Sequence, residues 1–179
     1  MNPTGRNVSS EKKWKGIRAP WIGTKQVWNL LEKLNLINTN IVEEINSKKP
    51  SEWTAEFAQK VYENIASNSV YITNLSKATQ IDARPLTNNI FREYFGLFRK
   101  EISLTNPKII ISFGNQVSSI ILNKPISVSK YRKRYELLEI ENKQYRVYPV
   151  FYPVGQGTPN IKFAKQDIKW ILKNMEKVM

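Results

Sequence analysis

Neither cysteine nor histidine occurs in the sequence of 179 residues. The lack of cysteine excludes disulfide bonds, thiolate zinc sites and cysteine-ligated iron–sulfur clusters. The lack of histidine removes the imidazole that many enzymes use as a base, a proton relay or a metal ligand. Any catalysis must therefore depend on carboxylates, amides, hydroxyls, lysines and backbone groups, and we expect neither a metal nor a cofactor.

Long apolar segments are also lacking, because no run approaches the roughly 18 residues of a membrane span. The N-terminal stretch MNPTGRNVSSEKKWK is polar and does not have the pattern of a signal peptide. Hydrophobic residues nevertheless make up 41% of the chain and aromatic residues 11%, which favours a packed globule over a disordered chain. We expect one domain over residues 1–179, in a monomeric cytoplasmic protein without a membrane partner.

Acidic residues are few in comparison with basic ones. The chain has 28 lysines and arginines against 15 acidic residues, which gives a net charge of +13 and a pI near 9.9. Such an excess favours a polyanionic partner, with nucleic acid ahead of a membrane surface. The alternative is a protein from a lysine-rich proteome whose members are all somewhat basic.

Apolar spacing divides the chain into alternating helices and strands. Intervals of three and four predict helices over 24–34, over 50–67, from Phe91 to Ile102, over 116–122 and from Ala164 to Met175. The apolar runs 70–75 and 108–114 predict buried strands, and residues 135–153 predict a hairpin or a bent strand pair. The alternation predicts an α/β fold, a three-layer α/β/α domain with a small, mainly parallel sheet.

Three polar segments follow predicted strands or open the chain. They are NPTG at residues 2–5, TNLSK at 73–77 and YPVGQGTPN at 152–160. Ligands of open parallel sheets bind beyond the carboxyl ends of the strands, so these segments are the candidate site.

The same motifs, in the same order, occur in the uracil-DNA glycosylase superfamily. MNPTG is similar to the GINPG or GMNPG motif of its mismatch-specific and single-strand-selective branches, and RAPWIGTKQVWNLLEKLNL is similar to the segment that follows. YITNLSKA resembles the strand that ends in a base-reading asparagine, and PKIIISFGNQVSSIIL resembles a PKVIVALG-type strand and helix. VFYPVGQGTPN stands at the place of the second motif, HPS or NPS. The resemblance covers nearly the whole chain and implies hydrolytic removal of a uracil-like base in DNA repair.

This resemblance implies a role for each matching residue. Asn2 would position the attacking water, and Trp21 would stack beneath the flipped base. Asn74 would bind the O4 and N3–H edge of uracil through its amide. Tyr152 replaces the usual histidine and would donate a hydrogen bond to the charge that develops on the leaving base. We expect Trp21, Asn74 and Tyr152 to line one cleft.

Contacts to DNA are expected around that cleft. Lys77 and Arg84 would border the pocket, and Gly155 and Gly157 would let the backbone approach the phosphates. Gln156 stands where the family commonly has a leucine wedge, and a glutamine would fill the vacated base stack less well. Two clusters mix basic and aromatic residues as phosphate-binding surfaces do, namely Lys12-Lys13-Trp14-Lys15 and Tyr131-Arg132-Lys133-Arg134.

Other interpretations remain open. The tyrosine at position 152 favours a DNA-binding protein that keeps the fold without hydrolysis. A glycosylase for hypoxanthine or mismatched thymine would use the same motifs. Each residue also has an ordinary structural explanation, since Asn74 can be a strand-end asparagine, Trp21 a core tryptophan and Gly155 a left-handed turn residue.

Overall fold

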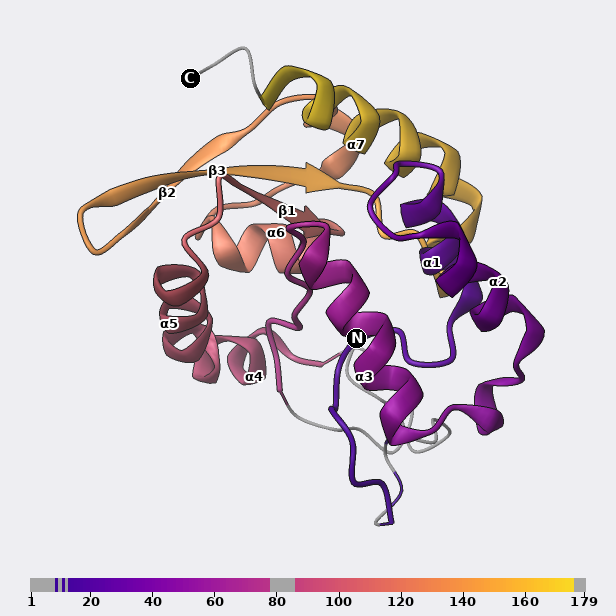
Figure 1. Ribbon diagram of the computed structural model, residues 1–179. Coiled ribbons are helices and arrows are strands. Elements are labelled where there is room, and N and C mark those ends of the chain that lie inside the picture. The colour runs from indigo at the N-terminus through magenta and orange to yellow at the C-terminus, as the bar shows by residue number, and fades with distance from the viewer. Residues whose placement is uncertain (1–8, 10, 12, 78–85, 176–179) are drawn as a thin grey trace. The chain divides into compact units, whose positions relative to one another are not determined.

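The computed structural model describes residues 9, 11, 13–77 and 86–175 (Figure 1). The chain forms two compact units, residues 1–86 and residues 87–179, and each is described by itself. The expectation of a single domain over the whole chain stays a prediction.

The described part of the first unit is helical. Its elements are α1 (Lys25–Glu32), α2 (Thr39–Ser47), the 3-10 turn η2 (Pro50–Glu52) and α3 (Ala55–Ser67). The helix predicted to start at Pro50 starts instead at Ala55, because the Thr54 hydroxyl accepts a hydrogen bond from the Phe57 backbone N–H at 3.1 Å and so caps α3. The helix α2 was not predicted from the sequence.

Aromatic side chains fill the centre of the first unit. The fully buried Trp28 of α1 packs against Trp53, with ring centroids 6.3 Å apart, and edge-on against Tyr62 of α3 at 5.7 Å. Trp53 in turn contacts Phe57 at 4.8 Å. These rings connect α1 to α3 through a large apolar area, the dominant source of stability in a small core.

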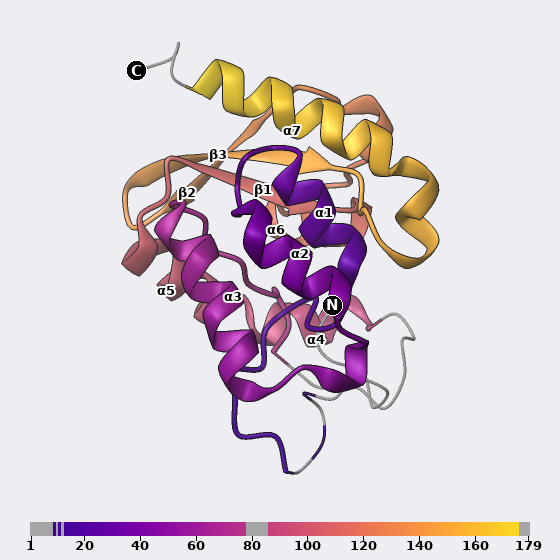
Figure 2. The same ribbon diagram turned by 45° about the vertical axis from the view of Figure 1, so that its right-hand side comes forward.

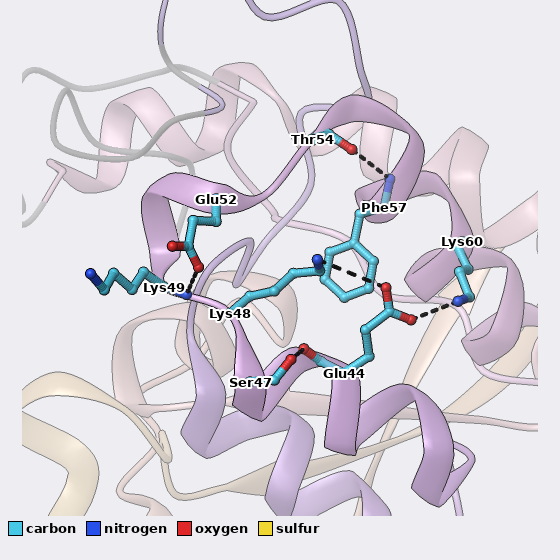
Figure 3. Close-up of polar contacts among 8 residues, drawn as sticks. All are labelled: Glu44, Ser47, Lys48, Lys49, Glu52, Thr54, Phe57 and Lys60. Atoms are coloured by element: carbon cyan, nitrogen blue, oxygen red, sulfur yellow. Dashed lines mark hydrogen bonds and ion pairs between the residues drawn. The ribbon is translucent and has the colours of Figure 1, made fainter.

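Polar contacts join α2 to α3 (Figure 3). The Glu44 carboxylate accepts a hydrogen bond from the Lys60 ammonium at 2.6 Å and lies 4.0 Å from the Lys48 ammonium. The Lys48 ammonium also lies 5.0 Å from the centroid of the Phe57 ring. The Glu52 carboxylate accepts the Lys49 backbone N–H at 2.6 Å and closes the turn between the helices. One acid therefore neutralises two lysines in this unit.

The predicted strand over residues 70–75 is wrong. The segment is extended but belongs to no strand of the described chain, and Tyr71 within it is 55% exposed. Its short apolar run fits a strand, but a strand also needs a neighbour in register, which no local pattern specifies.

The second unit contains helices and the sheet. Its elements are α4 (Asn88–Glu93), α5 (Phe95–Thr105), β1 (Ile109–Phe113), α6 (Asn115–Ile121), η3 (Val128–Lys130), β2 (Glu136–Ile140), β3 (Lys143–Val150), η4 (Gly155–Asn160) and α7 (Ile161–Met175). The helix predicted from Phe91 to Ile102 is two helices, because the chain turns at Tyr94.

The sheet has three strands in the order β1-β3-β2. β1 pairs with β3 in parallel, with Ile111 opposite Tyr148, and β2 pairs with β3 in antiparallel orientation. Glu141 and Asn142 have φ values of 51° and 62°, as a two-residue hairpin turn requires. The predicted strand at 108–114, the hairpin and the α/β class are confirmed, but the sheet of the described residues is mixed rather than mainly parallel.

Helices lie on both sides of this sheet. α7 packs on β3 from one side, whereas α6 and α5 lie on the other, against β1 and β2 (Figures 1 and 2). A buried hydrogen bond links the sheet to α6, because the hydroxyl oxygens of Ser112 in β1 and Ser118 in α6 lie 2.8 Å apart. The carboxyl ends of the parallel strands β1 and β3 thus lie side by side. The chain continues from β1 into α6 and from β3 towards η4.

Candidate functional site

Tyr152 lies where the two parallel strands end together. Phe113 and Val150 are the last residues in register, and the backbone N–H of Gly114 donates to the Val150 carbonyl at 2.8 Å. Gly114 has a φ of +86°, and a Cβ built on it would lie 3.6 Å from the Cβ of Tyr152. The strand ends therefore place the half-buried Tyr152 beside the turn that starts α6, the usual position of a ligand site in a parallel sheet.

A tight loop follows Tyr152. The N–H of Gly157 donates to the Val154 carbonyl at 3.0 Å, and Gly155 has a φ of +58°, which favours glycine. A Cβ on Gly157 would collide with the carbonyl oxygen of Tyr152 and lie 2.8 Å from its carbonyl carbon. The close approach of the loop to the Tyr152 backbone thus requires a glycine at position 157. Gly155 and Gln156 are exposed at the tip of the loop.

Contacts between side chains connect the segment before this loop to α7. The Phe151 ring lies 5.7 Å from that of Phe163, and the Arg132 guanidinium stacks 4.7 Å from the Phe163 centroid. Arg132 also holds Asp167, which is only 1% exposed, through three hydrogen bonds of 3.0 to 3.1 Å. Arg132 was expected at a DNA-facing rim, but its guanidinium binds Asp167 instead.

Trp21 lies in a locked turn of the first unit. Its φ of +64° belongs to the left-handed region that a tryptophan rarely adopts. Its carbonyl accepts from the Thr24 N–H at 2.9 Å and from the Trp28 indole N–H at 3.1 Å, and the Tyr62 hydroxyl donates to the Pro20 carbonyl. Burial raises the pKa of Tyr62 well above its ordinary value, so the phenol stays protonated as a donor.

Lys77 folds back onto the segment that contains Asn74. Its ammonium donates to the Thr73 hydroxyl and to the Asn74 carbonyl, both at 2.6 Å. The Asn74 backbone is therefore held by a cation three residues further along. Both side chains are half-buried, and the expected contact of Lys77 with DNA stays a prediction.

The predicted site residues fall into both units. Trp21, Asn74 and Lys77 belong to the first unit, and Tyr152 and the loop 155–157 belong to the second. Their meeting in one cleft stays a prediction. Two further site residues, Asn2 and Arg84, lie outside the described residues.

Three contributors were missed by sequence reasoning, namely Gly114, Tyr62 and Asp167. Only Gly114 had a local signal, because a glycine directly after an apolar strand marks the turn into the next helix. Tyr62 and Asp167 act through partners 42 and 35 residues away in the sequence, which no local pattern connects.

Comparisons with known proteins found no match for this chain, either among family models or among curated proteins. Within the described ranges, no three acidic side chains gather in a way that could hold a metal ion. Nor do the described helices include one of the length and apolarity needed to cross a membrane.

Proposed function

We propose that the protein is a DNA N-glycosylase that removes uracil or a related deaminated base, with a three-layer fold like that of the uracil-DNA glycosylases. The observation that carries this proposal is the place of Tyr152, at the joint carboxyl end of β1 and β3 and beside Gly114. Parallel sheets bind ligands there, and the sequence resemblance puts the second motif at the same position.

In this proposal each of the motif residues has its own task. Asn74 binds the edge of the flipped base and Trp21 stacks on its face, while the Tyr152 hydroxyl donates to O2 as the bond between the sugar and the base breaks. Asn2 orients the water whose oxygen joins the sugar carbon, and the departing base takes up a proton. No cofactor takes part.

The locked turn at Trp21 supports the proposal. A left-handed tryptophan is strained, and such strain persists only where surrounding contacts impose it. Here two hydrogen bonds to its own carbonyl impose it. A stacking ring on a rigid backbone loses little freedom when a base binds, which favours binding of the extruded nucleotide.

A DNA-binding protein without hydrolysis is the second candidate. It is favoured by the composition of the site, because Trp21, Asn74, Lys77 and Tyr152 include no carboxylate or imidazole that could act as a base near pH 7. The same experiment separates the two functions.

The test is single-turnover cleavage of labelled oligonucleotides with one uracil, one hypoxanthine or one mismatched thymine, followed by hot alkali to break abasic sites. We expect cleavage at uracil and a loss of about 10²-fold or more in Tyr152→Phe, because removing one donor to a developing anion typically has this effect. Tyr135→Phe, a change on an exposed tyrosine of the same unit, is the matched control. Binding of DNA without cleavage of any of the three bases would overturn hydrolysis in favour of the second candidate.

A further inference from the structure

The positive charge of the protein is concentrated in its second unit. Residues 87–179 contain sixteen basic and seven acidic residues, a net charge of +9, whereas residues 1–86 contain twelve and eight, a net charge of +4. Most of the excess positive charge therefore lies in the second unit, whereas a uniformly basic composition would divide it about equally between the two.

Much of this charge lies along one face of α7. The buried face of the helix consists of Ala164, Asp167, Ile168 and Ile171. The opposite face carries lysines at intervals of three and four residues, namely Lys162, Lys165, Lys169 and Lys173. At 1.5 Å per residue, neighbours in this row are about 5–6 Å apart along the helix axis.

Among the residues that the structure describes, no acidic neighbour neutralises this row. Asp167 is the one acid of α7, and its buried carboxylate is bound by Arg132. Within the part of the chain that the structure describes, the four lysines form no ion pair. The contrast with the first unit is plain in Figure 3, where Glu44 lies between Lys48 and Lys60.

Arg132 extends the charged surface beyond the helix. Besides Asp167, its guanidinium donates to the Gln166 side chain at 3.0 Å. On a helix, Gln166 neighbours Lys162, Lys169 and Trp170, three and four residues away. The turn that contains Arg132 therefore adjoins the lysine row, and its other cations are exposed. We call the combined surface the α7 basic face, consisting of Lys130, Lys133, Arg134, Lys162, Lys165, Lys169 and Lys173.

We propose that the α7 basic face binds the phosphate backbone of nucleic acid, as an anchoring surface separate from the base-binding residues. A row of regularly spaced cations without acids fits the regularly spaced charges of a nucleic-acid strand. Trp170, 36% exposed beside the row, offers a ring to a base or a sugar. A lipid surface fits less well, since α7 buries its apolar face in the fold and has none left to insert.

This inference shares with the proposed function only the partner, and its test does not need base excision. Binding of a labelled, uracil-free oligonucleotide is measured across salt concentrations for the wild type and for the triple variant Lys162→Gln, Lys169→Gln and Lys173→Gln. The control triple, Lys33→Gln, Lys100→Gln and Lys108→Gln, removes the same charge from exposed lysines elsewhere. Both triples are checked by urea unfolding, since glutamine keeps the helix propensity of lysine.

Each phosphate contact contributes about 0.9 to the slope of log affinity against log salt. We expect the α7 triple to reduce the slope by roughly 2 to 3 and the affinity near 0.1 M salt by on the order of 100-fold, and the control triple to change both much less. Equal losses of affinity and slope in the two triple variants would show that only the net charge of the protein matters, and would overturn the proposal. Stronger α7-dependent binding to phosphatidylserine vesicles than to DNA would overturn it in favour of a membrane. Failure to excise uracil, with this binding intact, would count against the proposed function alone.

Discussion

The guanidinium of Arg132 and the buried carboxylate of Asp167 join a surface turn to α7 through three hydrogen bonds. The Asp167 side chain is 1% exposed and the Arg132 side chain 31% exposed. The carboxylate has therefore lost nearly all contact with water, and the guanidinium is the cation that neutralises it. The same guanidinium lies over Phe163, which contacts Phe151 next to Tyr152. This pair therefore connects the α7 basic face to the candidate site.

Arg132→Leu should destabilise the protein by about 3–5 kcal/mol, because it leaves a buried carboxylate without its cation. Removing both charges, in Arg132→Leu with Asp167→Leu, should recover most of that loss. Lys124→Leu is the control, since Lys124 and Glu136 form a surface ion pair at 2.7 Å whose loss should change the free energy of unfolding much less. Urea unfolding measures the free energy of unfolding of the wild type and of these three variants, and a double variant no more stable than Arg132→Leu would contradict the coupling.

Two glycines should respond to alanine with opposite signs. Gly157→Ala should destabilise the fold and reduce base excision, because its Cβ would collide with the carbonyl oxygen of Tyr152. Gly96 lies exposed in the first turn of α5, where an added Cβ would meet no atom within 4 Å. Gly96→Ala should therefore stabilise the protein by roughly 0.4–1 kcal/mol, because alanine restricts the unfolded chain more than glycine does. Thermal unfolding with the excision assay checks both, and unchanged excision in Gly157→Ala would show that the loop tolerates a shift of Tyr152.

Tyr62 predicts a loss of stability in alkaline solution. Burial raises its pKa in the folded state above the ordinary value of 10.0, so the folded protein keeps a proton that the unfolded chain releases. Its contribution is complete below about pH 10 and is lost as the pH rises further, at up to about 1.4 kcal/mol per pH unit. Tyr62→Phe should be less stable than the wild type at pH 7, where the Pro20 carbonyl loses its donor, but should lose less stability between pH 9 and pH 11. Parallel curves for the two proteins would refute this assignment.

Local signals in the sequence predicted the second unit better than the first. The run of apolar residues in β1 and the turn after Ile140 are complete within a few residues, so the strand and the hairpin could be predicted. The spacing of Phe91, Phe95 and Phe98 continues smoothly through Tyr94, so nothing marked the break between α4 and α5.

The site divides in the same way. Tyr152 could be placed from the strand that precedes it, because the end of a parallel strand is a local feature. The positive φ of Trp21 could not be predicted, because it depends on the indole of Trp28 seven residues further along. The extended segment 70–75 shows the limit most clearly, since pattern alone does not provide a neighbouring strand.

In the proposed function the choice of base depends on Asn74, whose amide would offer one donor and one acceptor to uracil. Asn74→Asp would present two acceptors to an edge that offers an acceptor and a donor, so one hydrogen bond would become a repulsion. Such a mismatch in a binding site costs roughly 1–3 kcal/mol or more, which predicts a loss of about 5-fold to 150-fold or more in uracil excision. Cytosine, whose amino group suits a carboxylate, should be cleaved better by the variant than by the wild type.

Single-turnover cleavage of uracil and cytosine oligonucleotides by both proteins measures this exchange. Thr73→Val serves as the control, because it removes a ligand of the Lys77 ammonium and leaves the Asn74 amide in place. If the wild type cleaves uracil and Asn74→Asp cleaves it equally fast, then Asn74 does not bind the base. A slow Asn74→Asp with an unaffected Thr73→Val would instead assign recognition to the Asn74 amide itself rather than to the loop that Lys77 holds.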